Sequence, residues 1–214
     1  MAEKKYHHGD LKNALIEAGA EILSKEGVSG LSLRKVASRA GVSHAAPYAH
    51  FADKQALIAA ISTEGYRRLY EKLTLLIQNY PADPLQRFVE LAWTYVEFAC
   101  SDPDLFKVTF SSVLEKEKEF PAFVEMTRKN FQLLVETVKA CQAAGVLKPG
   151  PADMLAVSAW SLVHGFASLL IEDQFSHTVL DRMTRRQMLI FTLNQITLLE
   201  LTPNMFSLPD REID

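Results

Sequence analysis

Residues 32–51 combine side chains that can bind nucleic acid with a pattern of helix breaks. The stretch "SLRKVASRAGVSHAAPYAHF" carries, in an alanine-rich background, Arg34, Lys35, Arg39, His44, Tyr48 and His50. Arginine, lysine and histidine donate hydrogen bonds to phosphates and base edges, whereas a protein core rarely accepts so many cations. Gly41 and Pro47 interrupt the stretch, so the pattern predicts two short helices joined by a tight turn.

The spacing of small residues in this stretch agrees with a helix-turn-helix unit. Ala37 and Gly41 lie four residues apart and are followed by the apolar Val42. In such a unit the second helix crosses close over the first, and the turn favours a residue that tolerates positive φ. Alanine and glycine are common residues, so this spacing alone does not establish the unit.

We expect the second helix of this unit to enter the major groove of DNA. The methyl groups of Ala45 and Ala46 can meet thymine methyls, while His44 and Tyr48 can reach base edges or phosphates. Tyr48 can equally pack beneath the second helix, and both roles stay open for it. The expected DNA-binding residues are Ser32, Arg34, Ser43, His44, Ala45, Ala46, Tyr48, His50 and Lys54.

Several of these residues are expected to act at helix ends. Ser32 can cap a helix whose first amides face a phosphate, and Arg34 near that end can donate a bidentate pair to guanine. Lys54, at the start of the fourth helix, can bind a phosphate. Lys4 and Lys5 precede the first helix and can act as a flexible arm on DNA.

Other residues of the same region are better explained without DNA. Val36, Phe51 and Leu57 are apolar and are expected to form a small core. Lys35 and Arg39 can be merely solvated, because a charged face is the usual surface of a helix.

Bulk properties are compatible with a DNA-binding segment joined to a larger domain. The chain has 214 residues, is 48% hydrophobic and carries a net charge of −3, yet residues 1–58 hold eight Lys/Arg against six Asp/Glu.

Cys100 and Cys141 are expected to be reduced, buried thiols, and the first ten residues lack the apolar run of a signal peptide. We therefore expect a cytoplasmic protein. Residues 155–171 are apolar but shorter than a bilayer span, so we expect a buried helix and no membrane association.

Hydrophobic periodicity predicts an all-α fold of about nine helices. The first helix is expected to end at Gly27, and residues 203–214 are expected to form a frayed tail. The other expected helices cover residues 32–40, 43–50 (capped by Ser43), 53–79, 84–100, 104–114, 121–144, 152–172 and 184–201.

Several motifs resemble those of one family. "LSLRKVASRAGVS" and the pattern Y-x-H-F-x-x-K-x-x-L, which matches Tyr48, His50, Phe51 and Lys54, resemble the DNA-binding domain of TetR-type transcriptional regulators. "YHHGDL", "AAPY" and the Trp-x3-His-Gly motif that begins at Trp160 resemble one branch of that family. The resemblance is strong over residues 6–62. In this branch a larger, often basic side chain is common where Ala49 stands.

The resemblance implies a domain division and a small-molecule effector. It implies a helix-turn-helix domain at residues 1–62 and a helical effector-binding and dimerisation domain at residues 63–214. The implied function is sequence-specific binding to operator DNA and repression, relieved when a small molecule binds between the helices. Aromatic residues at helical spacing are more often core than ligand contacts, and His164 can be a buried histidine with a hydrogen-bond partner. The candidate pocket residues are Trp93, Glu97, Phe110, Thr127, Phe131, Trp160 and His164.

Two long apolar helices predict a homodimer. Residues 152–172 and 184–201 are apolar around more of their circumference than a surface helix requires, and a soluble monomer rarely exposes such a face. Pairing both with their symmetry mates would give a four-helix bundle and set two DNA-reading heads on a near-palindromic site. In a monomer both helices would instead be central to the core. The expected interface comprises Trp160, Leu162, Gly165, Phe166, Leu169, Phe191, Asn194 and Leu198.

Other classes of protein receive less support. An enzyme would need a nucleophile with a base, paired carboxylates or a metal cluster, and no such motif is evident. We therefore expect no catalytic residue, metal or cofactor. A helical enzyme or ligand-binding protein with an architectural helix-turn-helix is the alternative.

Overall fold

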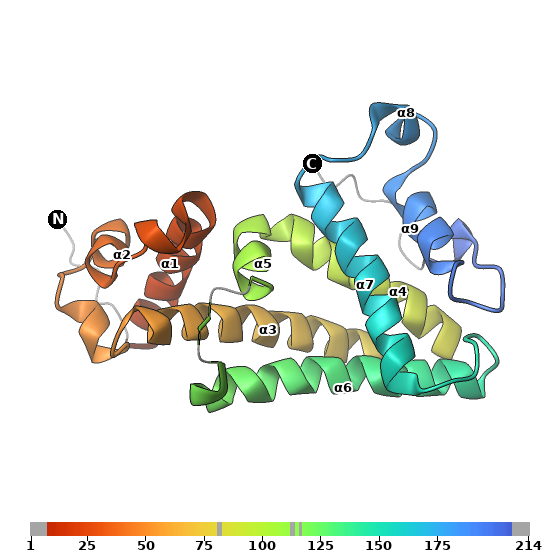
Figure 1. Cartoon of the computed structure of the whole chain (residues 1–214), viewed down its shortest axis with the longest axis horizontal. Coiled ribbons are helices and arrows are strands. Elements are labelled where there is room, and N and C mark those ends of the chain that lie inside the picture. Colours follow the sequence, from red (N-terminus) through yellow and green to blue (C-terminus); the bar gives the residue numbers. More distant parts are fainter. Residues whose placement is uncertain (1–7, 81–82, 112–113, 116, 207–214) are drawn as a thin grey trace. The chain divides into compact units, whose positions relative to one another are not determined.

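The computed structural model describes residues 8–80, 83–111, 114, 115 and 117–206, and its regular elements there are helices (Figure 1). The α-helices are α1 (His8–Gly30), α2 (Leu33–Arg39), α3 (Lys54–Asn79), α4 (Pro84–Ser101), α5 (Pro103–Thr109), α6 (Pro121–Ala143), α7 (Ala152–Ile171), α8 (His177–Leu180) and α9 (Arg185–Leu193). Three 3-10 helices accompany them: η1 (Ala46–Ala49), η2 (Glu117–Glu119) and η3 (Pro203–Met205). The predicted all-α fold is confirmed.

The chain divides into two compact units. The N-terminal unit draws on residues 1–68 and 103–127, and the C-terminal unit on residues 69–102 and 128–214. Helices α3 and α6 each contribute to both units. The expected boundary between residues 62 and 63 stays a prediction, because compactness does not establish which segments fold independently.

Local signals set the helix ends of the N-terminal unit. The side chains of Ser32 and Asp53 cap α2 and α3 by accepting backbone N–H groups at 3.2 and 2.8 Å. Gly27 and Gly41 have φ values of 68° and 70°, a region that glycine enters without steric penalty. The prediction that Ser32, Asp53 and Gly41 set helix limits is confirmed. Gly27 has a non-helical backbone and kinks α1 at the predicted end, but α1 continues beyond it to Gly30.

The second helix of the helix-turn-helix is shorter than predicted. The prediction of a helix over residues 43–50 capped by the side chain of Ser43 is wrong: η1 covers Ala46–Ala49 and has no side-chain cap. The carbonyl oxygen of Ser43 instead accepts Ala46 N at 3.0 Å. Pro47 has no N–H to offer a regular helix, and its ring is buried beneath this turn.

Two further helices end earlier than predicted. α5 ends at Thr109 instead of residue 114, and α9 ends at Leu193 instead of residue 201. Beyond α9 the side chain of Asn194 accepts Leu201 N at 2.8 Å and donates to Leu201 O at 3.1 Å. A short polar side chain that bonds the backbone in this way offers an alternative to the helix.

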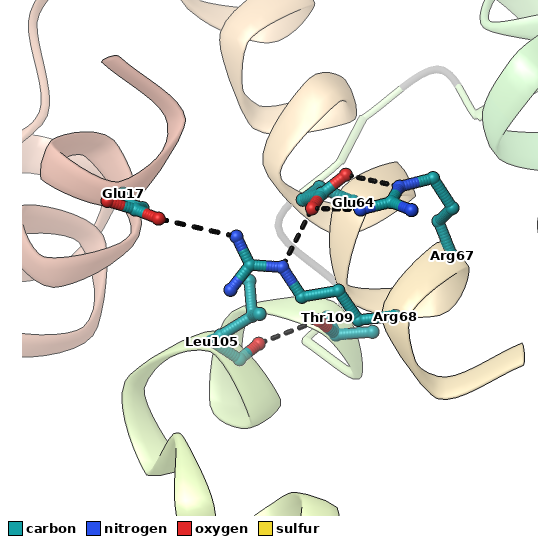
Figure 2. Close-up of polar contacts among 6 residues, drawn as sticks. All are labelled: Glu17, Glu64, Arg67, Arg68, Leu105 and Thr109. Carbon is teal, nitrogen blue, oxygen red and sulfur yellow. Dashed lines mark hydrogen bonds and ion pairs between the residues drawn. The ribbon is translucent and has the colours of Figure 1, made fainter. Parts of the chain in front are cut away.

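Within the N-terminal unit, α5 packs closely against α1 and α3. Ser24 Oγ of α1 donates to Asp104 Oδ1 of α5 at 2.7 Å. At Gly65 of α3, an added Cβ would overlap Thr109 Oγ1 and lie 2.9 Å from Thr109 Cβ. Figure 2 shows the Thr109 hydroxyl turned along α5, where it donates to Leu105 O at 2.7 Å. Only glycine fits at position 65 without moving Thr109.

The C-terminal unit is built from α4, α7 and α9, with α7 packed across α4 (Figure 1). The guanidinium of Arg186 lies over the rings of Trp93 and Phe206, at 4.8 and 4.7 Å from their centroids. Residues 203–206 are therefore packed, and the prediction that they belong to a frayed tail is wrong. Residues 207–214, the rest of that predicted tail, lie outside the described residues.

α7 is less buried than predicted. Met154 is 60% exposed and Leu169 is 46% exposed, so the expectation of a buried helix is wrong for the single chain. In the described part of the chain, α7 is the one helix whose length and composition would suit a membrane crossing, with a mean hydropathy of 1.7. One such helix is weak evidence for a membrane span, because a helix that packs on protein has the same composition.

Candidate DNA-binding site

The helix-turn-helix rests on a closed apolar frame. Val36 and Ala37 of α2 are completely buried, and Phe51 after η1 is 3% exposed. At the turn after α2, the backbone N–H of Val42 donates to the carbonyl oxygen of Ala37 at 3.0 Å. The frame therefore fixes the turn and leaves the opposite side of α2 and η1 to solvent.

The cations of α2 fall into two groups. Lys35 forms an ion pair with Glu26, and Arg39 forms one with Glu21, so these two side chains hold α2 against α1. Hydrogen bonds from Arg39 and then from Lys25 lower the pKa of Glu21 from 4.5 to about 2. The expectation that Lys35 and Arg39 are merely solvated is therefore wrong, because both form ion pairs with α1.

Arg34 differs from its neighbours on the same helix. Its side chain is exposed, and it makes no ion pair with any residue that the structure describes. No described residue therefore pairs with the guanidinium of Arg34, whose donors are open to a further partner.

The residues predicted to contact DNA surround this frame. Tyr48 is 55% exposed, which excludes packing beneath the second helix as its role. The ring of His50 lies 6.2 Å from the ring of Phe51, between centroids. Exposed members of the predicted set are Ser32, Arg34, Ser43, His44, Ala45 and Tyr48, and the half-exposed members are Ala46, His50 and Lys54. Their contacts with DNA stay predictions.

Lys54 has an internal partner. Its ammonium group donates to the carbonyl oxygen of Val28 near the end of α1. An ammonium has three donors, so this bond leaves two for a phosphate. Lys54 therefore joins α1 to the start of α3 in addition to any contact with DNA. Lys4 and Lys5, the predicted DNA arm, lie outside the described residues.

A network of charges joins α1 to α3 behind the helix-turn-helix. The guanidinium of Arg68 lies between Glu17 of α1 and Glu64 of α3, with N–O distances of 3.5 and 2.7 Å (Figure 2). Arg67 also donates to Glu64, at 2.7 Å. Burial raises the pKa of Glu64, but the hydrogen bonds from Arg67 and Arg68 outweigh burial and the pKa is lowered. Glu64, in the part of α3 that belongs to the N-terminal unit, is therefore held in its charged form.

The predicted pocket residues do not all belong to one unit. Phe110 and Thr127 lie in the N-terminal unit, where Phe110 packs on Tyr66 with 5.2 Å between ring centroids. The others lie in the C-terminal unit, in which Trp93 Nε1 donates to Glu97 Oε1 at 2.8 Å. The pocket itself stays a prediction.

His164 belongs to a small hydrogen-bonded cluster between α4 and α7. Its Nδ1 lies 2.7 Å from the hydroxyl of Tyr95, and Trp160 Nε1 donates to the same hydroxyl at 3.3 Å. Burial lowers the pKa of His164. The expectation that His164 has an internal hydrogen-bond partner is confirmed, and Tyr95, which it binds, was not singled out from the sequence.

The predicted dimer residues form a partly exposed surface on the C-terminal unit. Trp160, Leu169, Phe191 and Leu198 are 38%, 46%, 65% and 54% exposed. Leu162 and Gly165 are half-exposed.

Two members of the predicted interface set do not fit an apolar surface. Phe166 is 5% exposed and packs on Phe175, so it belongs to the core of the unit. Asn194 is polar and its amide is engaged with the backbone of Leu201. We therefore remove both from the interface.

Sequence reasoning also missed residues on the same surfaces. Met154 and Val157 extend the exposed face of α7. Met154, Val157 and Trp160 are spaced three residues apart, which places them on one face of a helix, so the sequence could have predicted this extension. Ser38 lies four residues after Arg34, on the same side of α2, and it contacts His44. No sequence pattern pointed to that contact, because it depends on the path of the turn.

Comparisons with known proteins agree with this geometry. Residues 15–61 match the family model "Bacterial regulatory proteins, tetR family", and residues 88–192 match "Tetracyclin repressor-like, C-terminal domain". The chain is 25% identical over 167 residues to YobS of Bacillus subtilis, an uncharacterized HTH-type transcriptional regulator, covering 78% of this chain and 82% of YobS. It is 26% identical over 182 residues to the HTH-type transcriptional regulator AcrR of Shigella flexneri, covering 81% and 82%.

A solved structure is similar over nearly the whole chain. A Rhodococcus protein of unknown function is 34% identical, with a TM-score of 0.70, over 90% of this chain and 96% of the other. The named relatives are transcriptional regulators and not enzymes. With a TetR-type helix-turn-helix at one end, a TetR-type C-terminal domain after it and an exposed polar surface on the turn, the chain belongs to the TetR family of DNA-binding transcriptional regulators.

Proposed function

We propose that this chain binds a near-palindromic operator as a homodimer and represses transcription until a small molecule releases it. The observation that carries the proposal is the exposed polar surface of α2 and η1. On it, Arg34, His44 and Tyr48 stand on a buried frame that fixes their positions. The description of the C-terminal family model as tetracycline-repressor-like supports repression.

Selection of bound sequences from random DNA tests operator recognition. We expect one enriched motif, with affinity that falls as salt rises because bound cations release counterions from the DNA. Arg34→Ala is expected to relax base preference at one position, by about 1–3 kcal/mol if a bidentate pair with guanine is lost. Lys35→Ala is the matched control, because Lys35 pairs with Glu26 inside the chain and is expected to leave the motif unchanged. Enrichment of no motif would refute sequence-specific binding.

The homodimer rests on the exposed apolar surface of α7 and the segment around α9. Met154, Val157, Leu169 and Phe191 are 41–65% exposed, whereas soluble monomers rarely expose large contiguous apolar patches. Apart from its neighbours and its own helix backbone, a Cβ added to Gly165 would meet no described atom within 4 Å. Glycine inside a helix nevertheless costs about 0.5–1 kcal/mol relative to alanine. Close approach of a second copy gives this glycine a reason that the single chain does not.

Light scattering with two leucine variants tests the dimer. Leu169→Glu places a charge in the proposed interface and is expected to give monomers that bind the operator weakly. Leu75→Glu is the control, because Leu75 of α3 is 62% exposed and lies outside the proposed interface. A wild-type chain that is monomeric at micromolar concentration and still binds a palindrome as one copy would refute the dimer.

Effector release is proposed to act through the C-terminal unit. The hydroxyl of Thr74 is buried, with no hydrogen-bond partner among the described residues, and such a group costs about 1–3 kcal/mol. A polar group of a ligand that binds this hydroxyl would remove the penalty. The ligand must bind the conformation that does not fit DNA more tightly, since equal affinity shifts nothing.

A screen for compounds that release operator DNA tests this part of the proposal. Thr74→Val keeps the shape of the side chain and removes its hydroxyl, so it is expected to weaken the response to a compound found with the wild type. An unchanged response excludes Thr74 as an anchor.

We further propose that residues 1–62 act as the DNA-binding domain and that residues 63–214 act as the effector and dimer domain. We propose that the protein works in the cytoplasm.

A further inference from the structure

Ser38 and His44 form a contact across the turn of the helix-turn-helix. Ser38 Oγ, on α2, lies 3.0 Å from His44 Nε2, just before η1. The same oxygen lies 3.1 Å from the carbonyl oxygen of Arg34, one turn earlier in α2. One hydroxyl therefore joins the backbone of α2 to a side chain on the surface expected to face DNA.

The two contacts together favour one position for the hydrogen of His44. A serine hydroxyl has one hydrogen, and a carbonyl oxygen can only accept. When both contacts are hydrogen bonds, the hydroxyl hydrogen of Ser38 points at Arg34 O and Ser38 Oγ accepts from His44. Nε2 of His44 is the donor, and in the neutral imidazole Nδ1 is then an acceptor.

We infer that Ser38 is a positioning residue for operator recognition, which holds His44 as a hydrogen-bond acceptor toward the major groove. This inference rests on the proposed function, in which His44 faces base edges. In the major groove, adenine and cytosine offer an amino group, while guanine and thymine offer acceptors at the corresponding atoms. His44 held by Ser38 therefore selects adenine or cytosine on the strand that it contacts. An unheld imidazole can turn or exchange its tautomer and donate to a guanine or thymine instead.

Selection from random DNA with the full-length chain tests this role. We expect the wild type to enrich adenine or cytosine at one position of each half-site, and His44→Ala to flatten that position. Ser38→Ala is expected to reduce the preference there by about threefold to tenfold, the value of one neutral hydrogen bond, and to leave the other positions unchanged. Ser38→Thr keeps a hydroxyl at the same place in α2 and is expected to restore the preference.

A second measurement does not depend on DNA. Nitrogen-15 chemical shifts of the imidazole in the free, full-length chain, measured in mildly alkaline buffer, are expected to show hydrogen on Nε2 of His44. Hydrogen on Nδ1 instead would overturn the inference, because Ser38 could not then accept from His44.

The outcomes separate this inference from the proposed function. Enrichment of a motif with a position that depends on His44 but not on Ser38 overturns the inference and leaves operator binding intact. A motif in which no position responds to His44→Ala overturns the inference and the expected contact of His44. No enrichment with any variant overturns the proposed function together with the inference.

Discussion

Gly65→Ala offers a sharp test of the packing that holds α5 on the DNA-binding head. An added methyl at this position of α3 would overlap the hydroxyl oxygen of Thr109 and lie 2.9 Å from its Cβ. Thr109 donates to Leu105 O (Figure 2) and is only 2% exposed, so its side chain cannot swing into solvent. Either α5 moves away from α3, or Thr109 turns and gives up its hydrogen bond.

The magnitude follows from three opposing effects. Extra methyl groups in a well-packed core cost about 1–3 kcal/mol, and a lost intrahelical hydrogen bond costs about 1 kcal/mol. Alanine gains about 0.5–1 kcal/mol over glycine through its helix propensity. We therefore expect Gly65→Ala to lower the free energy of unfolding by about 1–3 kcal/mol.

Urea unfolding followed by circular dichroism measures this change, and a second substitution identifies its cause. Thr109→Ala removes the hydroxyl that the new methyl would overlap, while its Cβ stays 2.9 Å away. The double variant is therefore expected to recover part of the loss, so that the two changes are not additive. A Gly65→Ala chain as stable as the wild type would show that α3 and α5 do not approach as closely as described.

Three further predictions concern individual groups. Because the pKa of Glu21 is lowered to about 2, its ion pairs stabilise the folded chain above about pH 4.5 and are lost as the pH falls toward 2; Glu21→Gln is expected to flatten the acid side of the stability profile, measured by unfolding at each pH. Lys54→Met removes the bond to Val28 O as well as the proposed phosphate contact, so we expect a lower melting temperature together with weaker binding to all DNA sequences; a loss of affinity without a loss of stability would contradict the internal role. Burial raises the pKa of the Cys141 thiol to about 12, whereas Cys100 is only half-buried. Iodoacetamide is therefore expected to label Cys100 first in the native chain, which mass spectrometry of the peptides measures. Equal labelling rates would contradict the burial of Cys141.

The sequence by itself determined the fold class and the limits of most helices, because these depend on local chemistry. Ser32 and Asp53 cap helices wherever an apolar periodic run follows them, and Gly41 ends α2 because its backbone adopts a φ of 70°. The motif around Tyr48 and Lys54 was sufficient to predict the family, since these residues are close in sequence.

Only the tertiary structure decided which side chains are available for binding. Charge alone did not separate Arg34 from Arg39, because the difference lies in the position of Glu21, eighteen residues from Arg39 and on another helix. Nor did periodicity predict that α9 ends at Leu193, because the early end depends on bonds between Asn194 and the backbone of a later segment. The contact of His44 with the hydroxyl of Ser38, at 3.0 Å, likewise depends on the path of the turn. Contacts between segments distant in sequence carry no local signal, and these contacts fix which groups remain for DNA.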